Sequence, residues 1–580
     1  MSGFAISVAD NGKRMISSDF TPTMNKAERY ALLGVHGCGI VNLQFVYDEP
    51  SAISAITSYG KSPESLGETL RGSLAILVRD TWYNRDYLLA DPFGGCMVQR
   101  YKSDGKEYYA SDLSTLKRRL ASDSVTLKKS IEYIMSIGLM GNGGIVESPF
   151  MGVSVLKPYH YVQFDASGAN EMQYRVETNL LDPSMKLEDS IDGFLNDLSL
   201  NVNAVSKDTA SVKISQITGG MDSRLVLGGL IANELQDEFV YFVGGDDNSL
   251  DVRSARNLCS ELGLTMTRYS GVDRSISPSG IDELTWPLLE TNGVLQGSAD
   301  PGLSANSNII LSGGYGEVLR SFYGKNRLPD LSNPQNTFRQ VYGEFGLGNN
   351  TKPGLWSDDF VESTGLSLQN LIRESEQTGI RGTAQLDYLY LSTRNRYFVG
   401  EISRSMSTYT RRFDPLYSPY LLSILSNSSM ESRHSGELQI SLLTRLSRDL
   451  VEIPFDTPRV SEDFAIAKGL RLRKTSDHGL PNFDGRRNAI PVRPSGILPL
   501  PESNRLKARA LEINMPYHAL RDAEFARIKL REFINESNSS LLSSYINISQ
   551  FMAFLETPVK WKPQIRFLRR MGSHLAWYDL

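Results

Sequence analysis

The 580-residue sequence predicts an α+β N-terminal domain followed by an α/β domain with a helical C-terminal part. Three observations predict this fold class. Short β-type runs between turn residues fill the first part, strands and helices alternate after residue 210, and β-branched runs become rare beyond about residue 380. A chain of this length is also too long for one compact core, so two or more domains are expected.

Short strands are predicted throughout the N-terminal part. The four clearest are expected at residues 74–78, 87–90, 97–101 and 108–110. Their spacing predicts a meander, with the Asp-Pro-Phe-Gly-Gly sequence at 91–95 as the turn between the second and third strands. A last strand is expected at 161–164. An acidic stretch after Leu180 leads into a helical pattern, so we place the boundary near 175–185 and assign residues 1–178 to the first domain.

The second part alternates strands and helices. Strands are expected at 211–217, 238–243, 265–269 and 308–311, and helical segments at 225–235 and 250–262. Strands separated by helices of these lengths pair in parallel through crossover connections. We assign residues 179–500 to this second domain.

The last part of the chain is predicted to be helical. Residues 475–501 are rich in Pro, Gly, Asn and Arg and are expected to form a loop or linker. Closing helices are expected at 507–534 and 541–555, and we assign residues 501–580 to a C-terminal extension.

Composition excludes several classes of function. The 66 acidic and 61 basic residues give a formal charge of -5, which provides no general attraction to nucleic acid or to an anionic membrane. Three dispersed cysteines and six scattered histidines make no disulfide framework, metal-ligand spacing or HExxH pair. The start of the sequence lacks a signal core, and no apolar run is long enough to span a bilayer. We therefore expect a cytoplasmic protein with no nucleic-acid or membrane partner.

A glycine pair follows the first strand of the second part. Gly219 and Gly220 would let the backbone approach a phosphate, and the helix that follows adds N–H groups and its dipole. Thr218 and Ser223 can add hydroxyl donors. A carboxylate repels phosphate unless a cation lies between them, so Asp222 predicts Mg²⁺. No lysine follows the glycines, which excludes a GxxxxGK[ST] loop. A strand-to-helix turn that merely requires glycine remains the structural alternative for this loop taken alone.

The Thr-Gly-Gly-Met-Asp-Ser sequence at 218–223 resembles the SGGxDS pyrophosphatase loop of the asparagine synthetase and ATP-pyrophosphatase group. A second segment, LSGGYGEVLRSFY at 311–323, resembles the family's LSGxGGDExxxGY segment. The resemblance implies that Gly313 and Gly314 contact the cofactor and that Glu317 replaces the family's Asp as the other metal ligand. The cofactors implied are ATP and Mg²⁺.

Further stretches in both parts of the chain resemble the same family. Residues 242–246, including Val243 and Gly244, and residues 249–255 resemble the strand and helix beside its adenine pocket. Residues 70–76, 89–94 and 109–113 resemble the glutaminase-like domain of asparagine synthetases. The implied folds are an Ntn-type glutaminase-like sandwich, and an ATP-pyrophosphatase (adenine nucleotide α-hydrolase-like) synthetase domain. The resemblance covers roughly residues 70–460.

The glutaminase nucleophile of the family is missing. A working domain of this type needs Cys at position 2, and this chain has Ser2. We therefore predict that glutaminase activity is lost and that the domain is kept for structure or substrate binding. An N-terminal Ser nucleophile is the alternative.

Among enzymes that resemble asparagine synthetase, the β-lactam synthetases and lasso-peptide cyclases also lack this cysteine. They adenylate a carboxylate, which an amine of the same substrate then attacks. The resemblance implies that Tyr315 helps to deprotonate the amine, or alternatively that it packs on the nucleotide. It also implies a cation near the end of the domain, for which Arg459 is the candidate and Lys468 and Lys474 are rivals. A solvated surface charge is the alternative for each of the three.

These observations predict an AMP- and pyrophosphate-forming amide ligase of the lasso-peptide cyclase kind. Its substrate would be a peptide or small molecule carrying a carboxylate and an amine, and its pathway partners a leader-peptide-binding protein and a protease. The alternatives are an amidotransferase that takes free ammonia or a separate amine for a glycan uronic acid or small metabolite, and a non-catalytic binding protein.

Overall fold

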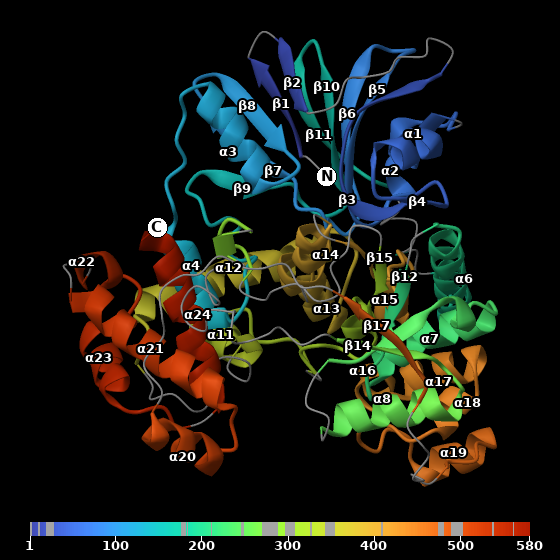
Figure 1. Cartoon of the computed structure of the whole chain (residues 1–580). Helices are drawn as coiled ribbons and strands as arrows, with labels where there is room; N and C mark the ends of the chain where they lie inside the picture. Colours follow the sequence, from blue (N-terminus) through green and yellow to red (C-terminus); the bar gives the residue numbers. More distant parts are fainter. Residues whose placement is uncertain are drawn as a thin grey trace.

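The computed structural model describes most of the chain: residues 3–9, 12–18, 28–57, 59–175, 181, 184–209, 212–244, 249–269, 288–289, 291–295, 308–324, 327–342, 354–407, 410–473, 481–488, 503–535, 539–560 and 562–579. Figure 1 shows a β-rich N-terminal domain at the top, an α/β domain below it on the right, and the C-terminal helices below it on the left. The predicted domain boundaries at 178/179 and 500/501 lie outside the described residues.

Two antiparallel sheets form the N-terminal domain. The first has the order β2-β1-β8-β7-β9 and the second β11-β10-β6-β5-β3-β4. The strands are β1 Phe4–Ala9, β2 Arg14–Ser18, β3 Tyr30–Val41, β4 Gln44–Val46, β5 Arg71–Asp80, β6 Arg85–Ala90, β7 Gln99–Ser103, β8 Lys106–Ala110, β9 Val153–Val155, β10 His160–Asp165 and β11 Gly168–Gln173. The predicted strands at 74–78, 87–90, 108–110 and 161–164 all fall within these elements, and 97–101 overlaps β7.

The alternation of side chains along β5 explains the layering. Leu74, Ile76 and Val78 belong to the core shared with α1 (Glu49–Thr57) and α2 (Pro63–Glu68). Ala75 and Leu77 belong to the core between the two sheets. Helix α3 (Leu113–Ser122) covers the outer face of the other sheet, so the layers run helix, sheet, sheet, helix (Figure 1). The predicted sandwich is confirmed.

The predicted meander is wrong in one respect. Strands β5 and β6 pair with each other, as do β7 and β8, but β6 and β7 belong to different sheets. The turn between them crosses from one sheet to the other because the buried Asp91 carboxylate accepts the N–H groups of Gly95 (3.0 Å) and Cys96 (2.9 Å). These bonds form a turn within residues 91–96, and the chain leaves this turn into the other sheet. In a hairpin, β7 would instead pair with β6.

A six-stranded parallel sheet forms the centre of the second domain, in the order β16-β15-β12-β13-β14-β17. The strands are β12 Val212–Gln216, β13 Val240–Phe242, β14 Met266–Tyr269, β15 Asn308–Leu311, β16 Arg411–Phe413 and β17 Phe483–Asn488. The chain starts at β12, moves outward through β13 and β14, and returns to the opposite side of β12 at β15. The predicted parallel pairing is confirmed.

The strand β17 corrects the prediction that residues 475–501 form only a loop or linker. It pairs in parallel with β14, and the N–H of Met266 donates to the carbonyl of Asn482 at 2.8 Å. Its sequence, FDGRRN, lacks an apolar pattern because the strand lies at the edge of the sheet, where charged residues and glycine are tolerated.

Helices account for most of the remaining described chain. They are α4 Ile131–Met140, α6 Leu187–Ser206, α7 Met221–Ala232, η1 Gln236–Glu238, α8 Leu250–Glu261, α10 Gly316–Leu319, α11 Pro334–Tyr342, α12 Asp358–Gln377, α13 Ala384–Tyr390, the π-helix η4 Leu391–Gly400, α14 Glu401–Met406, α15 Leu421–Asn427, α16 Met430–His434, α17 Glu437–Leu446, α18 Asp449–Glu452, α19 Glu462–Lys468, α20 Asn504–Glu512, α21 Tyr517–Phe533, α22 Ser539–Leu542, α23 Ile548–Glu556 and α24 Lys562–Asp579. Across the described parts of the chain, no helix is both long and apolar enough to cross a bilayer.

The C-terminal helices pack against the rest of the chain. The helix predicted at 507–534 is interrupted before Pro516 and becomes α20 and α21. The last helix, α24, was not predicted. Lys129 of the N-terminal domain donates to the carbonyl of Trp577 at 2.7 Å, and a Cβ at Gly138 would lie 2.2 Å from the sulfur of Met571. The extension is therefore built onto helix α4.

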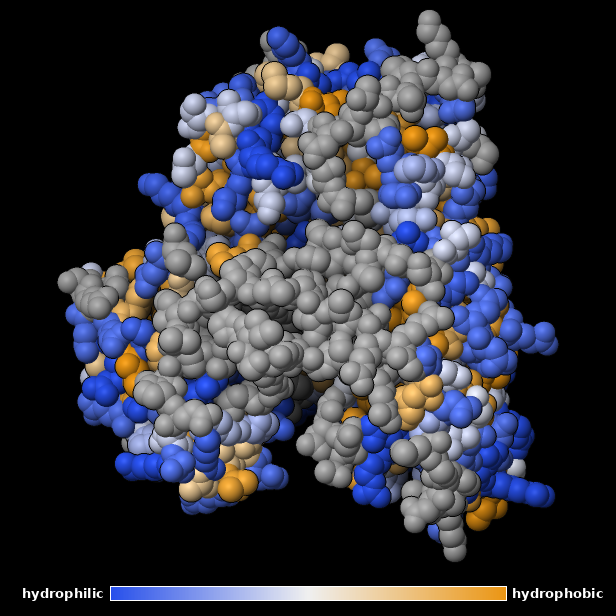
Figure 2. All heavy atoms as spheres, viewed as in Figure 1, coloured by the Kyte–Doolittle hydropathy of each residue, from blue (hydrophilic) through white to orange (hydrophobic). Residues whose placement is uncertain are grey.

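Hydrophilic residues predominate on the face shown in Figure 2, where hydrophobic residues form scattered patches. A notch at the lower edge of this view separates the lobe of the C-terminal helices from the lobe that contains α8 and α19 (Figures 1 and 2).

Buried arginines join the N-terminal domain to the second domain. Arg396 on η4 donates through Nε to the carbonyl of Gly94 at 3.0 Å and through Nη2 to that of Leu156 at 2.6 Å. In the other direction, Arg71 of β5 pairs with Asp197 of α6 at 2.7 Å. The two domains are thus held by buried hydrogen bonds at Arg396 and by a partly buried ion pair at Arg71.

Replacing Arg396 with Met leaves the two buried carbonyls without these donors. We expect the first transition in differential scanning calorimetry to fall by an amount equivalent to about 2–4 kcal/mol. The control is Arg381→Met, because Arg381 makes only an exposed ion pair with Glu376 and its loss should change the transition little. Equal transitions for the two variants would contradict this account of the domain seam.

Candidate functional site

Both glycine motifs lie at the point where the strand order of the parallel sheet reverses. The loop at 217–220 follows β12, and the loop at 312–315 follows the adjacent strand β15. In open parallel sheets, ligands bind beyond the carboxyl ends of the strands at this switch point. The topology therefore brings the two segments together.

The first loop holds its shape through its own hydroxyl groups. The N–H of Thr218 donates to Ser223 Oγ at 3.0 Å, the two hydroxyls lie 3.0 Å apart, and the N–H of Gly220 donates to Thr218 Oγ1 at 3.1 Å. The N–H of Gly219 donates to Asp251 Oδ1 at 2.6 Å. In this structure the two glycine amides predicted to meet phosphate thus bond to acceptors within the chain. Helix α7 begins without a side-chain cap, so its own first N–H groups remain the available anion donors.

The second glycine motif packs directly on Asp222. A Cβ at Gly316 would lie 2.6 Å from both Cβ and Cγ of Asp222, and one at Gly313 would lie 3.1 Å from its Cβ. The N–H of Gly314 donates to the buried carboxylate of Asp414 at 3.2 Å, which anchors the loop to the end of β16. Only glycine permits this approach, so the close packing explains two of the glycines that the sequence singles out.

The two predicted metal ligands converge on one cation. Arg320 Nη2 lies 3.2 Å from Asp222 Oδ2 and 3.4 Å from Glu317 Oε1. The other carboxylate oxygens have donors of their own: Gln439 Nε2 donates to Asp222 Oδ1 at 3.0 Å, and the Tyr390 hydroxyl donates to Glu317 Oε2 at 2.7 Å. Burial, together with the nearby Glu317, raises the pKa of Asp222 to about 6 against the opposing effect of Arg320. Arg394 Nε also lies 3.9 Å from Glu317 Oε2, so the two acids attract cationic groups from two sides.

The donor set fits a divalent cation that shares its coordination with a ligand. No group of three His, Cys, Asp or Glu side chains forms a metal cage within the described residues. Two hard carboxylates from facing loops are what Mg²⁺ commonly takes from a protein when phosphate oxygens and water complete its shell. Asp222 and Glu317 would hold the ion.

The predicted adenine-pocket residues lie at the same edge of the sheet. Val243 and Gly244 follow β13, next to β12, where the N–H of Ile217 donates to the carbonyl of Phe242 at 2.8 Å. A Cβ at Gly244 would make an ordinary van der Waals contact with the Phe242 ring at 3.7 Å. The neighbouring positions 245–248 lie outside the described residues.

Tyr315 lies in the seam between the domains. Its backbone has φ 70°, and its buried ring packs on Phe93 and Tyr417, with centroids 5.5 and 5.0 Å away. Burial raises the pKa of Tyr315 well above 10, so the phenol stays protonated. The predicted role in deprotonating an amine would therefore require this ring to leave the seam.

Of the three candidate cations, the structure brings Arg459 to the loop. The N–H of Asp456 donates to the carbonyl of Gly219 at 3.2 Å, and Arg459 Nη2 lies 3.5 Å from Asp456 Oδ1. Lys468 is exposed at the end of α19 with its Nζ 5.8 Å from the Phe464 ring centroid, and no contact with the loop is found among the described residues. Lys474 lies outside them.

Arg224 was missed by the sequence analysis. It is fully buried in the first turn of α7 and donates to the carbonyls of Leu450 (2.9 Å), Ile453 (2.7 Å) and Pro454. Its guanidinium lies 3.8 Å from the Phe455 ring centroid. This one side chain fixes the segment that carries Asp456 and Arg459 against the glycine loop. The sequence signal that could have identified it is an arginine within the otherwise largely apolar sequence of α7, which indicates a buried and therefore hydrogen-bonded guanidinium.

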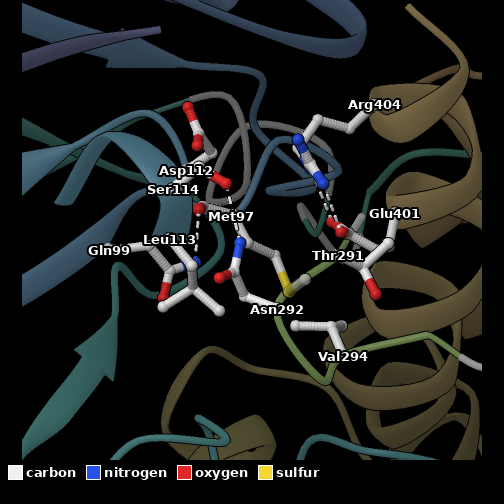
Figure 3. Close-up of a pocket in the computed structure, with 10 residues that line it drawn as sticks. All are labelled: Met97, Gln99, Asp112, Leu113, Ser114, Thr291, Asn292, Val294, Glu401 and Arg404. Atoms are coloured by element: carbon white, nitrogen blue, oxygen red, sulfur yellow. Dashed lines mark hydrogen bonds and ion pairs between the residues drawn. The ribbon is translucent and has the colours of Figure 1, made fainter. Parts of the chain in front are cut away.

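A second, small polar cavity lies in the seam where the N-terminal domain meets α14 (Figure 3). Its lining residues are Met97, Gln99, Asp112, Leu113, Ser114, Thr291, Asn292, Val294, Glu401 and Arg404. Glu401 and Arg404 form a buried bidentate pair (2.8 and 2.5 Å), and Asn292 Nδ2 donates to Ser114 Oγ at 2.7 Å. A Cβ at Gly3 would lie 2.2 Å from Asp112 Oδ2, so the start of β1 borders this cavity. Ser2 itself lies outside the described residues.

Comparisons with known proteins leave the family open. No protein-family model and no curated protein matches the chain. Among solved structures, it shows 12% identity to glutamine phosphoribosylpyrophosphate amidotransferase from B. subtilis complexed with ADP and GMP, over 54% of this chain and 69% of that chain, with a TM-score of 0.19. It shows 10% identity to the allosteric regulatory enzyme of purine biosynthesis, over 59% and 72% of the respective chains, with a TM-score of 0.18. TM-scores this low carry no argument about fold or activity.

Replacing Arg224 with Met leaves three carbonyls without their shared donor. We expect a loss of about 3 kcal/mol or more, measured by urea unfolding, because unsatisfied buried acceptors are costly. Arg445 makes exposed ion pairs with Glu188 and Asp192 and provides the matched control, since Arg445→Met should cost little. A stable Arg224→Met protein would show that the 450–456 segment is held by other contacts.

His36 predicts an acid-sensitive fold. Burial lowers the pKa of His36 to about 4, against the effect of the Asp112 carboxylate and with the help of Arg404 and Arg118. The unfolded chain therefore binds an extra proton between about pH 6.5 and 4, and up to about 3 kcal/mol of stability is lost as pH falls through that window. Thermal melts of His36→Leu should show a flatter dependence on pH than the parent. Parallel curves of melting temperature against pH would contradict this role of His36.

A second buried histidine adds to the effect. Burial lowers the pKa of His574 to about 4 as well, so the melting temperature of the His36→Leu/His574→Leu double variant should depend on pH even less.

Proposed function

We propose that the chain uses ATP and Mg²⁺ to activate a carboxylate by adenylation and then forms an amide, releasing AMP and pyrophosphate. The observation that carries this proposal is the convergence of Asp222 and Glu317 on one cation position at the switch point of a parallel sheet. The alternative, that the glycines serve only the shape of a strand-to-helix turn, gives no reason for an acid of the second loop to face Asp222.

The residues of the site have separable tasks in this proposal. The uncapped start of α7 binds phosphate oxygens through its N–H groups, while the Thr218 and Ser223 hydroxyls keep the loop in shape. Mg²⁺, when bound, offsets the repulsion between the attacking carboxylate and the phosphates. Arg459 stabilises negative charge that develops beside the loop. Asp456 holds Arg459 in place through an ion pair, and Arg224 holds the backbone of residues 450–454, which leads into Asp456.

We further propose that the amine comes from the same substrate, as in a macrolactam cyclase. Helix α13 lies beside the acid pair, where the buried Tyr390 hydroxyl donates to Glu317 at 2.7 Å. A substrate that carries its own amine brings that amine close to the activated carboxylate without a second binding event.

The proposal is tested by measuring pyrophosphate and AMP release against a substrate panel. Linear peptides with a free N-terminus and an internal Asp or Glu form one arm, and small acids with ammonium form the other. Release that depends on the peptide, with loss of one water from its mass, supports the cyclase. Release only with a small acid and ammonium supports an amidotransferase, and no nucleotide turnover or binding at all supports a binding protein.

The same assay tests the roles of Asp222 and Arg459 and compares Arg459 with Lys468, another candidate for the catalytic basic side chain. We expect Asp222→Ala to abolish turnover and Arg459→Ala to reduce kcat at least tenfold, because the first acts on the cation and the second on developing charge. Lys468→Ala should change kcat less than twofold, since its side chain lies on the surface. The reverse ranking of Arg459 and Lys468 would contradict the role given to Arg459.

A further inference from the structure

Arg320 is held by the two acids of the candidate site. It follows the short helix α10, and its side chain is 42% exposed. Within the described parts of the chain, its polar contacts are Asp222 Oδ2 at 3.2 Å and Glu317 Oε1 at 3.4 Å, both made by Nη2.

The two acids are so arranged that they can lose Arg320 without losing their orientation. Gln439 holds the other oxygen of Asp222, and Tyr390 holds the other oxygen of Glu317. The oxygens that face Arg320 are thus the ones that no other side chain bonds. The guanidinium is 42% exposed and reaches both acids through one nitrogen, so its release breaks no buried two-point ion pair.

We propose that Arg320 is a phosphate-binding residue that the acid pair holds in reserve. Asp222 and Glu317 release it when they bind a divalent cation, and its guanidinium then turns to the phosphates of the nucleotide. This inference rests on the proposed function, and it adds a residue to the proposed phosphate site that the glycine motifs do not include. The planar guanidinium matches phosphate oxygens with two parallel hydrogen bonds.

Electrostatic attraction stabilises both arrangements of the site: Arg320 bound to the acids, and a divalent cation bound to the acids with Arg320 on the phosphates. With Arg320 between them, and with Arg394 Nε 3.9 Å from Glu317 Oε2, the two carboxylates are offset by two guanidinium groups, and Arg320 is not free to bind phosphate. With a divalent cation in that place, the acids are neutralised and the freed guanidinium presents a positive charge. The metal ion and Arg320 therefore compete for the same carboxylate oxygens, whereas the nucleotide phosphates and Arg320 attract each other.

This competition predicts opposite effects of one substitution on two ligands. In isothermal titration of the full chain, Arg320→Met should bind Mn²⁺ alone at least fivefold more tightly than the parent, because no side chain competes for the oxygens. The same variant should bind Mg²⁺ with a non-hydrolysable ATP analogue at least tenfold more weakly. Arg320→Lys keeps the charge but not the paired donors, so it should restore the parent's Mn²⁺ affinity and only part of the nucleotide affinity. Arg381→Met is the matched surface control and should change neither.

The outcomes separate this inference from the proposed function. A parent chain that binds the analogue, with an Arg320→Met variant that binds it equally well, overturns the role of Arg320 alone. Unchanged or weaker Mn²⁺ binding by Arg320→Met overturns the competition. A parent chain that binds no analogue removes the proposed function and this inference with it. Thermal melts of each variant show whether it is folded, and Arg320→Lys provides the test if Arg320→Met is not.

Discussion

The close approach of Gly316 to Asp222 is the contact on which the arrangement of the candidate site depends. Any side chain at position 316 would overlap the carboxyl group of Asp222 and push the two loops apart. Their separation would remove Glu317 from its place opposite Asp222 and leave Arg320 with one partner. The parallel sheet brings the loops to the same edge, and the glycine allows them to touch.

Buried arginines transmit this arrangement to the rest of the molecule. Arg224 ties the first turn of α7 to the chain that carries Arg459, and Arg396 ties the second domain to the N-terminal sandwich. Each guanidinium satisfies carbonyls that have no strand or helix partner there. Burying a charge is costly, so such residues occur where several acceptors converge and must be held at once. The N-terminal domain is thereby fixed against the domain that carries the site.

The sequence predicts most of the fold because the main signals are local. Alternating apolar residues in β5 mark a strand buried on both faces, and the glycine turns between strands and helices mark the parallel sheet. Three features escaped prediction for physical reasons. The chain crosses between sheets at Asp91 because of hydrogen bonds that no periodicity records, β17 lies at a sheet edge with no apolar pattern, and α24 is recognised only through its packing on α4.

The candidate site is predictable to a similar extent. Asp222 is predicted from its place in the glycine loop and Glu317 from the resemblance of its segment to a known family, and the structure brings both to Arg320. Arg224 escapes because the carbonyls that it binds are more than 200 residues away, and Arg320 because its contact with Asp222 crosses between two loops. Tyr315 shows the opposite limit: its place in the motif suggested chemistry, whereas its ring fills the seam between the domains.

A crystal structure of the chain with Mg²⁺ and a non-hydrolysable ATP analogue tests the central claim most directly. The account predicts phosphate density at the start of α7 and a metal ion between Asp222 and Glu317. Nucleotide bound elsewhere, or an acid pair still closed on Arg320 beside a bound nucleotide, would contradict it.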